Sequence, residues 1–339
     1  MTLTRRDVIK TAVALPLGGL ALSNSVKAKA STLPDKASFG KMDVSYLDNG
    51  SQHPISLEGS NAVEAYLSKR RLDPSAPKGL HDSVVPLQLF AKLINADVDE
   101  IAYVQSTTAG EQMVLRSLGL PIAGGHIVTD KLHFPGSFST YKWMEREGME
   151  VTWLEEKNGR IELDDVEQAV RSGTKLIVLS LVSTRNGFQH DLKAVCDIAH
   201  AKGAYVYADI VHGAGCIPID VKESGVDFAA TASYKWLMGD FGLGFLYVRK
   251  DVLPKIKRTN YGYFGLNTGR TDEARAEAAA NGGYPISASG YFALGTRSFT
   301  TVAILEKSLQ YIHGIGVNNI QNHAQILTNR LKEELPRLG

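Results

Sequence analysis

The chain has 339 residues, of which 44% are apolar and 22% charged, with a net charge of +1 and two cysteines. This composition is typical of a globular protein with a large core, and it excludes a disordered chain, a collagen-like repeat and a disulfide scaffold. A nucleic-acid-binding surface would need a clear excess of basic residues, so the balanced charge argues against a nucleic-acid partner.

The first 30 residues have the pattern of an export signal. Arg5 and Arg6 precede an apolar run from Ala12 to Leu22, and the small-x-small sequence Ala28–Ala30 suits a signal peptidase. The run is too short to span a bilayer as a helix. The paired arginines resemble a twin-arginine signal, which predicts export by the twin-arginine translocase to the periplasm or another outside location, without membrane attachment after cleavage. A disordered basic tail is the alternative.

Strand and helix patterns then alternate along the chain. Short apolar runs predict strands at Ile101–Val104, His126–Thr129, Glu150–Leu154, Lys175–Ser180, Ala204–Asp209, Phe228–Ala232 and Gly244–Val248. Helical patterns lie between them, at about 111–118, 137–147, 163–172 and 192–202. Regular alternation of this kind predicts an α/β fold: a mostly parallel, doubly wound sheet with helices on both faces.

The pattern changes after about Tyr261. Residues 261–290 are rich in Gly, Ala and charge and predict a mobile loop or connection, and two amphipathic helices are predicted at about 300–311 and 318–335. Three regions are therefore expected: a signal peptide over 1–30, a large domain with an N-terminal arm over 31–260, and a connection with a smaller, apparently truncated α+β domain over 261–339.

The two cysteines do not require a disulfide bond. Cys196 lies in a helical pattern and Cys216 follows a Gly-rich turn. An exported chain could pair them, but two buried free thiols are the expected state. No metal site is predicted.

Polar residues gather where predicted strands end, which is where ligands bind in open parallel sheets. Thr107 and Thr108 open a helix directly after a strand, so their hydroxyl and N–H groups could bind a phosphate, although an ordinary helix cap has the same pattern. Asp209 ends an apolar strand, where a carboxylate needs a cation or donor unless it lies in an exposed turn.

Three further residues could contact a ligand. Lys235 has small, aromatic and apolar neighbours, which favour an uncharged amine suited to Schiff-base chemistry, although its stem could instead cover Trp236. His212 follows Asp209, where a lone histidine is often structural. Phe134 follows a strand and could stack on a flat ligand or fill the core. A lysine, an acid, a phosphate site and an aromatic ring together suit pyridoxal phosphate.

Three segments carry a resemblance to a known family: Val206–His212, Ser233–Gly239 and Gly242–Val248. In these segments the chain resembles class V aminotransferases, a group of pyridoxal-phosphate enzymes that includes cysteine desulfurases and isopenicillin N epimerase. The resemblance implies pyridoxal 5'-phosphate as cofactor and the fold of the large domain of these transferases.

The resemblance also implies roles for individual residues. Lys235 holds the cofactor and moves the substrate's α-proton, Asp209 keeps the ring nitrogen protonated, and His212 lies near the phenolic oxygen. Either Thr184 or Asn186 contacts that oxygen as well. The remaining implied cofactor contacts are the phosphate pair Thr107 and Thr108, Ser233 near the phosphate, Phe134 on the ring with His133 as the alternative register, and Thr296, which reaches the phosphate of a second subunit and so implies a homodimer.

The expected activity is transamination at the α-amine of an amino acid or small peptide, through a Schiff base at Lys235. Epimerisation and C–S or β-elimination lyase activity are the alternatives, and a non-catalytic or truncated relative is the alternative of another class. Neither Cys196 nor Cys216 matches the loop cysteine of desulfurases, which disfavours that reaction. Arg185 and Arg297 are possible binders of the substrate carboxylate.

Overall fold

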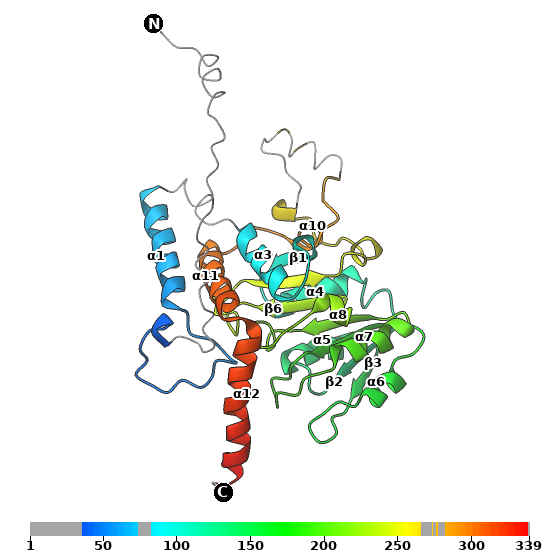
Figure 1. Cartoon of the computed structure of the whole chain (residues 1–339). Coiled ribbons are helices and arrows are strands. Elements are labelled where there is room, and N and C mark those ends of the chain that lie inside the picture. The colour runs from blue at the N-terminus through cyan, green and yellow to red at the C-terminus, as the bar shows by residue number, and fades with distance from the viewer. Residues whose placement is uncertain (1–35, 74–82, 266–272, 274–275, 277–281, 338–339) are drawn as a thin grey trace, which may run out of the picture. The chain divides into compact units, whose positions relative to one another are not determined.

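A computed structural model describes residues 36–73, 83–265, 273, 276 and 282–337 (Figure 1). Seven strands form one sheet in the order β1-β7-β6-β5-β4-β2-β3. The strands are β1 (Ile101–Val104), β2 (His126–Asp130), β3 (Glu150–Leu154), β4 (Thr174–Ser180), β5 (Tyr205–Asp209), β6 (Phe228–Ala232) and β7 (Gly244–Val248). Only β7 runs antiparallel to its neighbours, so the other six strands end at the same edge of the sheet.

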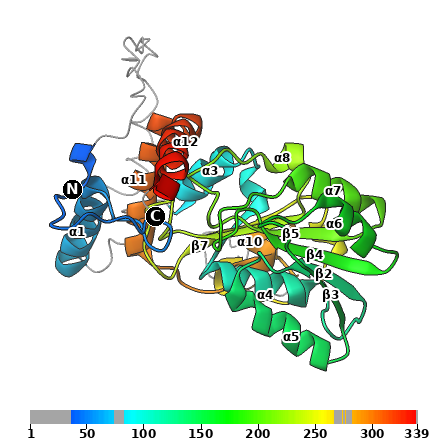
Figure 2. The same ribbon diagram turned by 90° about the horizontal axis from the view of Figure 1, so that it is seen from below.

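Helices cover both faces of this sheet (Figure 2). One core cluster joins one face to α3 (Val84–Leu93), α6 (Leu163–Ala169), α7 (Leu192–Ala201) and α11 (Phe299–Ile315). A second cluster joins the other face to α4 (Thr107–Ser117), α5 (Phe138–Arg146) and α10 (Ala288–Phe292). The predicted α/β class is confirmed, and each of the seven predicted strands lies within a residue of its observed bounds.

The remaining elements are peripheral or short. They are α1 (Leu57–Leu72), α8 (Val221–Ser224), α12 (Val317–Glu334) and the 3₁₀ turns Lys36–Ser38, Val98–Glu100, Pro135–Ser137 (η3), Leu253–Lys255, Tyr263–Gly265 and Leu335–Arg337. Helix α1 packs on α11, whereas α12 continues from α11 with no buried residue. The sequence patterns did not predict α1 or α3.

The predicted ends of two helices were wrong: α11 continues to Ile315 instead of ending at about 311, and α6 ends early. Helix α4 begins at Thr107, as expected for a helix that Thr107 and Thr108 open after the strand, because the Ser106 side chain accepts the N–H of Ala109 at 3.1 Å and caps the helix there. Helix α6 ends at Ala169 instead of 172, because Val170 turns into extended backbone and buries its side chain.

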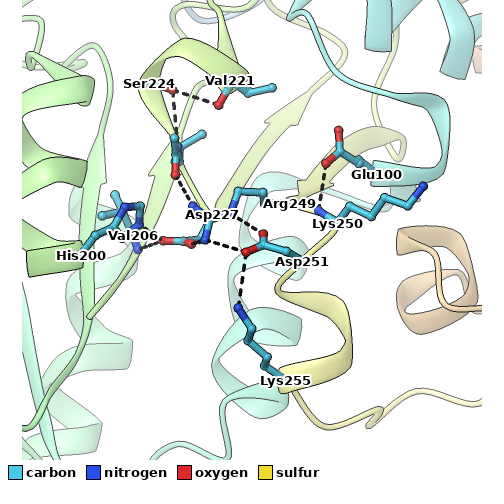
Figure 3. Close-up of polar contacts among 12 residues, drawn as sticks. Glu100, His200, Val206, Val221, Ser224, Asp227, Arg249, Lys250, Asp251 and Lys255 are labelled. Atoms are coloured by element: carbon cyan, nitrogen blue, oxygen red, sulfur yellow. Dashed lines mark hydrogen bonds and ion pairs between the residues drawn. The ribbon is translucent and has the colours of Figure 1, made fainter. Parts of the chain in front are cut away.

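A buried ionic network closes the edge of the sheet where β5 and β6 begin (Figure 3). Asp227, fully buried, accepts the N–H of Val206 at 2.8 Å and lies 2.9 Å from His200 Nε2 and 3.0 Å from Arg249 Nη2. These contacts join the start of β5, the start of β6 and the residue after β7. The network is therefore a structural clamp on three adjacent strands.

The structure bears in different ways on the predictions made for the cysteines, the signal segment and the domain division. Cys196 and Cys216 are free thiols as expected, but Cys216 is only half-buried. The predicted signal over 1–30 and most of the segment 266–281 lie outside the described residues. The division at residue 260 stays a prediction. Among the helices that the structure describes, none is long and apolar enough to span a membrane.

Candidate active site

A lysine and a histidine meet at the edge of the sheet where β5 and β6 end. Strand β5 ends at Asp209 and turns into His212, while β6 ends at Ala232 and leads to Lys235. Because β5 and β6 are adjacent parallel strands, the two loops lie together. Nζ of Lys235 lies 3.1 Å from Nε2 of His212, within hydrogen-bonding distance.

The surroundings of Lys235 and His212 lower both of their pKa values and so favour their uncharged forms. Partial burial lowers the pKa of Lys235, against the opposing influence of the Asp209 and Asp48 carboxylates. Burial, followed by the nearby Lys235 charge, lowers the pKa of His212 to about 4. His212 is therefore neutral at pH 7, and its Nε2 can accept a hydrogen from Nζ. Perturbed groups of this kind in a cavity are typical of catalytic sites.

Asp209 lies buried beside this pair, with 4% of its surface exposed. Burial raises the pKa of its carboxyl to about 6, while the Val211 N–H, which donates to Oδ1 at 2.9 Å, and the charges of His133 and Lys235 oppose that rise. An ionised carboxylate in such surroundings favours a cationic partner.

The Lys235–His212 pair opens into a cavity of about 600 Å³. Thr184 and Asn186, in the loop after β4, line it together with Cys216. The other lining residues come from the N-terminal arm, the loop after β4, the His212 and Lys235 loops and helix α12: Asp48, Gly50, Ser51, Val182, Ser183, Gly187, Gln189, Ile217, Trp236, Gln321, Ala324, Gln325, Thr328 and Lys332. Neither Arg185 nor Arg297 is among these lining residues.

The N-terminal arm contributes to the site in a way that sequence reasoning missed. The N–H of His53 donates to the carbonyl of Tyr234 at 2.9 Å, and the His53 ring lies against Trp236 with centroids 6.3 Å apart. These contacts hold the arm against the lysine loop. Such pairing joins segments far apart in the chain, so no local sequence signal could have revealed it.

Two other predicted features follow β1 and β2, which end at the same edge of the sheet but are not adjacent to β5 or β6. Thr107 and Thr108 begin α4. The first N–H groups of a helix have no acceptor carbonyl within the helix, so they can donate to a ligand. Phe134 follows β2 with 39% of its surface exposed, whereas His133 beside it is fully buried. The exposed ring makes Phe134 the residue of the two that can stack on a ligand.

The structure places the remaining predicted residues in different surroundings. The Ser233 hydroxyl donates to the Asp240 carbonyl at 2.5 Å and closes the lysine loop. Asn186 bonds to backbone groups, donating to the Gly159 carbonyl at 2.8 Å. Thr296 lines a separate cavity of about 300 Å³ together with Gln105, beside the start of α4.

The arrangement fits pyridoxal phosphate on the chemistry of its groups. Lys235 offers an amine, Asp209 a buried carboxylate for a protonated ring nitrogen, and α4 its N-terminal N–H groups for a phosphate. Phe134 offers an exposed aromatic face. Within the part of the chain that the structure covers, no group of three or more His, Cys, Asp or Glu could hold a metal ion.

Comparisons with known proteins agree with this chemistry. The family model described as "Aminotransferase class-V" matches residues 88–339. The uncharacterised aminotransferase YcbU of Bacillus subtilis strain 168 is 32% identical over 70% of this chain and 60% of its own length. The cysteine desulfurase IscS of Shewanella loihica is 34% identical over 51% of this chain and 43% of its own length. The chain thus spans about half the length of these curated relatives.

Solved structures show the same fold. An apo cysteine desulfurase from Thermococcus onnurineus NA1 has a TM-score of 0.73 at 23% identity, covering 87% of this chain and 74% of that one. A C-DES variant with glycine covalently linked to its pyridoxal-phosphate cofactor has a TM-score of 0.76 at 21% identity, covering 88% of this chain and 78% of that one.

Proposed function

This chain belongs to the class V aminotransferase family, and from that premise we propose that Lys235 binds pyridoxal phosphate and removes the α-proton of an amino acid substrate. The family's enzymes depend on this cofactor. The observation that carries the proposal is the contact of 3.1 Å between Lys235 Nζ and His212 Nε2, beside the buried Asp209.

The residues at the sheet edge have complementary tasks in this reaction. When bound, pyridoxal phosphate supplies an electron sink for the electron pair left on the α-carbon. Asp209 would hold the ring nitrogen in its protonated form, and Phe134 would cover one ring face. His212 accepts a hydrogen from Nζ and so orients it, and the lowered pKa of Lys235 leaves Nζ able to take up the α-proton.

We favour C–S bond cleavage over the transamination expected from the sequence. The relatives and structural neighbours include cysteine desulfurases and a protein described as a cystine C–S lyase. In such a reaction Lys235 removes the α-proton and the β-carbon releases its sulfur as a thiolate, which takes up a proton. Water then converts the remaining dehydro amino acid into a 2-oxo acid and ammonium, so no external oxidant is needed.

The state of Cys216 favours release of the sulfur as a free thiol. Cys216 lines the cavity with Lys235, but burial raises the pKa of its thiol. A protonated thiol is a poor nucleophile, so Cys216 is a weak sulfur acceptor at neutral pH. Transamination is the second candidate, because the aminotransferase YcbU aligns with a larger share of the chain than the desulfurases do.

The first experiment locates the cofactor on the chain. The purified protein, loaded with pyridoxal phosphate, is treated with borohydride and mapped by peptide mass spectrometry, with Lys235→Ala as the matched variant. We expect a reduced adduct on Lys235 and none in the variant. An adduct on another lysine, or no adduct, would remove the proposed role of Lys235.

The second experiment distinguishes the reactions. The loaded protein is incubated with cystine or cysteine and with other amino acids, with and without a 2-oxo acid. Pyruvate and a released thiol without any added 2-oxo acid identify C–S cleavage. Amino transfer that requires the 2-oxo acid identifies transamination. Inversion of configuration at the α-carbon of the amino acid identifies epimerisation. Either of these two results without thiol release would overturn the lyase proposal, as would no turnover with a Lys235 adduct present.

We also propose that the mature chain is exported by the twin-arginine route and acts as a homodimer. The support is the sequence pattern around Arg5 and Arg6, together with the resemblance of the Thr296 segment to one that reaches a second subunit. Replacing both arginines by lysine should retain the protein in the cytoplasm. Sedimentation equilibrium of the mature chain should give twice the monomer mass, and a monomer would contradict the dimer.

A further inference from the structure

A buried ion pair that the proposed reaction does not use lies behind Asp209. His133 is fully buried and Glu111, on α4, is 3% exposed. Nε2 of His133 lies 3.7 Å from Oε1 of Glu111, an ion-pair distance. The hydroxyl of Ser137 donates to Oε2 of Glu111 at 2.7 Å, and the hydroxyl of Tyr141 donates to Oε1. Two ionisable side chains are thus sealed in the core with donors arranged around the carboxylate.

The pair is connected to the strand that carries Asp209. Nδ1 of His133 lies 3.0 Å from the hydroxyl oxygen of Ser180, which also accepts the N–H of Phe134 at 3.2 Å. Ser180 ends β4 and is the register partner of Asp209 at the end of β5. His133 is therefore fixed over the end of the strand pair that presents Asp209.

The charges within this cluster favour ionised forms on both sides of the pair. Burial alone would lower the pKa of His133, but the carboxylates of Glu111, Asp209 and Asp130 outweigh it and raise that pKa. Burial would likewise raise the pKa of Glu111, but His133, Tyr141 and Ser137 hold it below its ordinary value. The raised pKa favours the imidazolium form of His133, and that positive charge opposes the effect of burial on the Asp209 carboxyl.

We propose that His133, kept charged by its buried pairing with Glu111, is a positioning residue that holds Asp209 as a carboxylate for the ring nitrogen of the cofactor. This inference rests on the proposed function, since it concerns how the cofactor is held. His133 does not need to touch the cofactor, because it acts through Asp209.

Other ionisable groups also surround Asp209, and the test must separate them from His133. Around Asp209 and His133 they come from α4, α5, the end of β2 and the loop after it, β5, and the loops after β5 and β6: Glu111, Tyr141, Asp130, His133, Tyr207, His212, Tyr234 and Lys235. His190 provides a matched control, because it is equally buried at the same edge but pairs with Asp130 at 3.4 Å.

The first test measures the dissociation constant of pyridoxal phosphate against pH. Asp209 ionises at about pH 6, so affinity in the wild type should fall as the pH drops through that value. In His133→Asn the favourable cation is gone, and the fall should begin about one pH unit higher, with roughly threefold weaker binding at pH 6.5. His190→Asn should leave the curve in place. Equal shifts in both variants would overturn the proposal.

Glu111→Gln should shift the pH at which cofactor affinity falls in opposite directions, depending on whether His133 is present. In the wild type it should move the fall to higher pH, because His133 loses its charge. In His133→Asn it should move the fall to lower pH, because only the repulsion between Glu111 and Asp209 is then removed. A shift in the same direction in both backgrounds would show that Glu111 does not act through His133.

A measurement on the apoprotein separates this inference from the function on which it rests. Carbon-13 labelled histidine, assigned from the difference between the wild type and His133→Asn, reports the charge of His133 by NMR without any cofactor. A signal of a charged imidazole at pH 7 that turns neutral in Glu111→Gln supports the pairing. A neutral His133 in the wild type overturns it, whether or not pyridoxal phosphate binds. Failure of cofactor binding with a charged His133 would instead count against the proposed function.

Discussion

Asp209 and Asp227 are buried carboxylates at opposite edges of the same sheet. Because their surroundings differ, the two carboxylates have opposite effects on the stability of the fold. Asp227 is met by a backbone N–H, a histidine and an arginine (Figure 3). Asp209 receives one backbone N–H on Oδ1 and lies beside the Lys235–His212 pair, which opens into the cavity. The first carboxylate stabilises the fold, whereas the second, for which we propose a role in cofactor binding, is buried at a cost in stability.

This cost can be measured in the apoprotein with Asp209→Asn. The folded pKa of Asp209, about 6, lies above its ordinary value of 3.8, so the folded state binds the proton more tightly than the unfolded state. Its stabilising contribution is complete below pH 4 and is lost as the pH rises through 6. The neutral variant should therefore be more stable than the wild type by about 3 kcal/mol at pH 7, and by much less at pH 4.

Urea unfolding at the two pH values measures this difference, and the shared contribution of His212 cancels because both proteins contain it. The same variant should lose affinity for pyridoxal phosphate. If the difference in free energy of unfolding between variant and wild type is the same at pH 4 and pH 7, then Asp209 is not desolvated in the apoprotein.

Asp227→Asn is expected to have the reverse effect on stability. Removing the carboxylate charge leaves the guanidinium of Arg249 and the ring of His200 without their shared buried partner. Breaking a buried pair of this kind costs about 3 kcal/mol or more. Chemical denaturation at pH 7 tests it, with Asp251→Asn as the control, since the exposed Asp251–Arg249 pair contributes about 1 kcal/mol or less. Equal losses in the two variants would contradict the clamp.

At the scale of elements, one glycine keeps the His212 turn against the lysine loop. Gly215 has φ of +90°, and a Cβ built on it would lie 2.7 Å from the carbonyl oxygen of Trp236. Gly215→Ala should therefore displace the segment that carries Lys235. Gly225→Ala is the matched control, because Gly225 also has a positive φ of +73° but its Cβ would meet only His200 at 3.7 Å.

Both variants should lose a comparable amount of stability from backbone strain, of the order of 1 kcal/mol. Only Gly215→Ala should also weaken the binding of pyridoxal phosphate, by roughly tenfold or more. Equilibrium dialysis with the cofactor measures this difference. Equal affinities in the two variants would mean that the Trp236 contact does not position Lys235.

The elements differ in how much of them the sequence could predict. Most of the strands were predictable because their apolar runs are buried on both faces of the sheet, as in β4 with its run from Leu176 to Leu179, whereas the edge strand β3 is largely half-buried. Helix α1 was not predictable, because its polar sequence has almost no amphipathic pattern and its contact with α11 is long-range. Tertiary packing thus supplied what local sequence lacked.

The same distinction applies to the candidate site. Asp209, His212 and Lys235 were found because they follow apolar strands, and the structure brings them together. The pairing of Glu111 with His133 was missed because one residue lies in a helix and the other in a loop, and only the folded sheet makes them neighbours. For Ser233 the predicted proximity to the phosphate stays a prediction, since its hydroxyl is bonded to Asp240.

At the scale of the whole molecule, early parts of the chain depend on late ones. Within the described residues, strand β1 pairs with β7 alone, and α1 packs on α11. Strands β2 to β6, of which β3 lies at the other edge of the sheet, instead pair with strands close to them in sequence. The sheet can therefore assemble from its middle, while both N-terminal elements wait for partners from the second half.

The pairing of β1 with β7 has a consequence for biosynthesis. A ribosome delivers Ile101–Val104 long before Gly244–Val248, so the nascent strand β1 has no partner in the described sheet until β7 has been made. During that interval its unpaired backbone N–H and C=O groups and its apolar side chains are open to chaperones or to another nascent chain. The sheet is thus closed at this side only after β7 has been synthesised, and α4, which contacts both β1 and β7, gains its full packing only then.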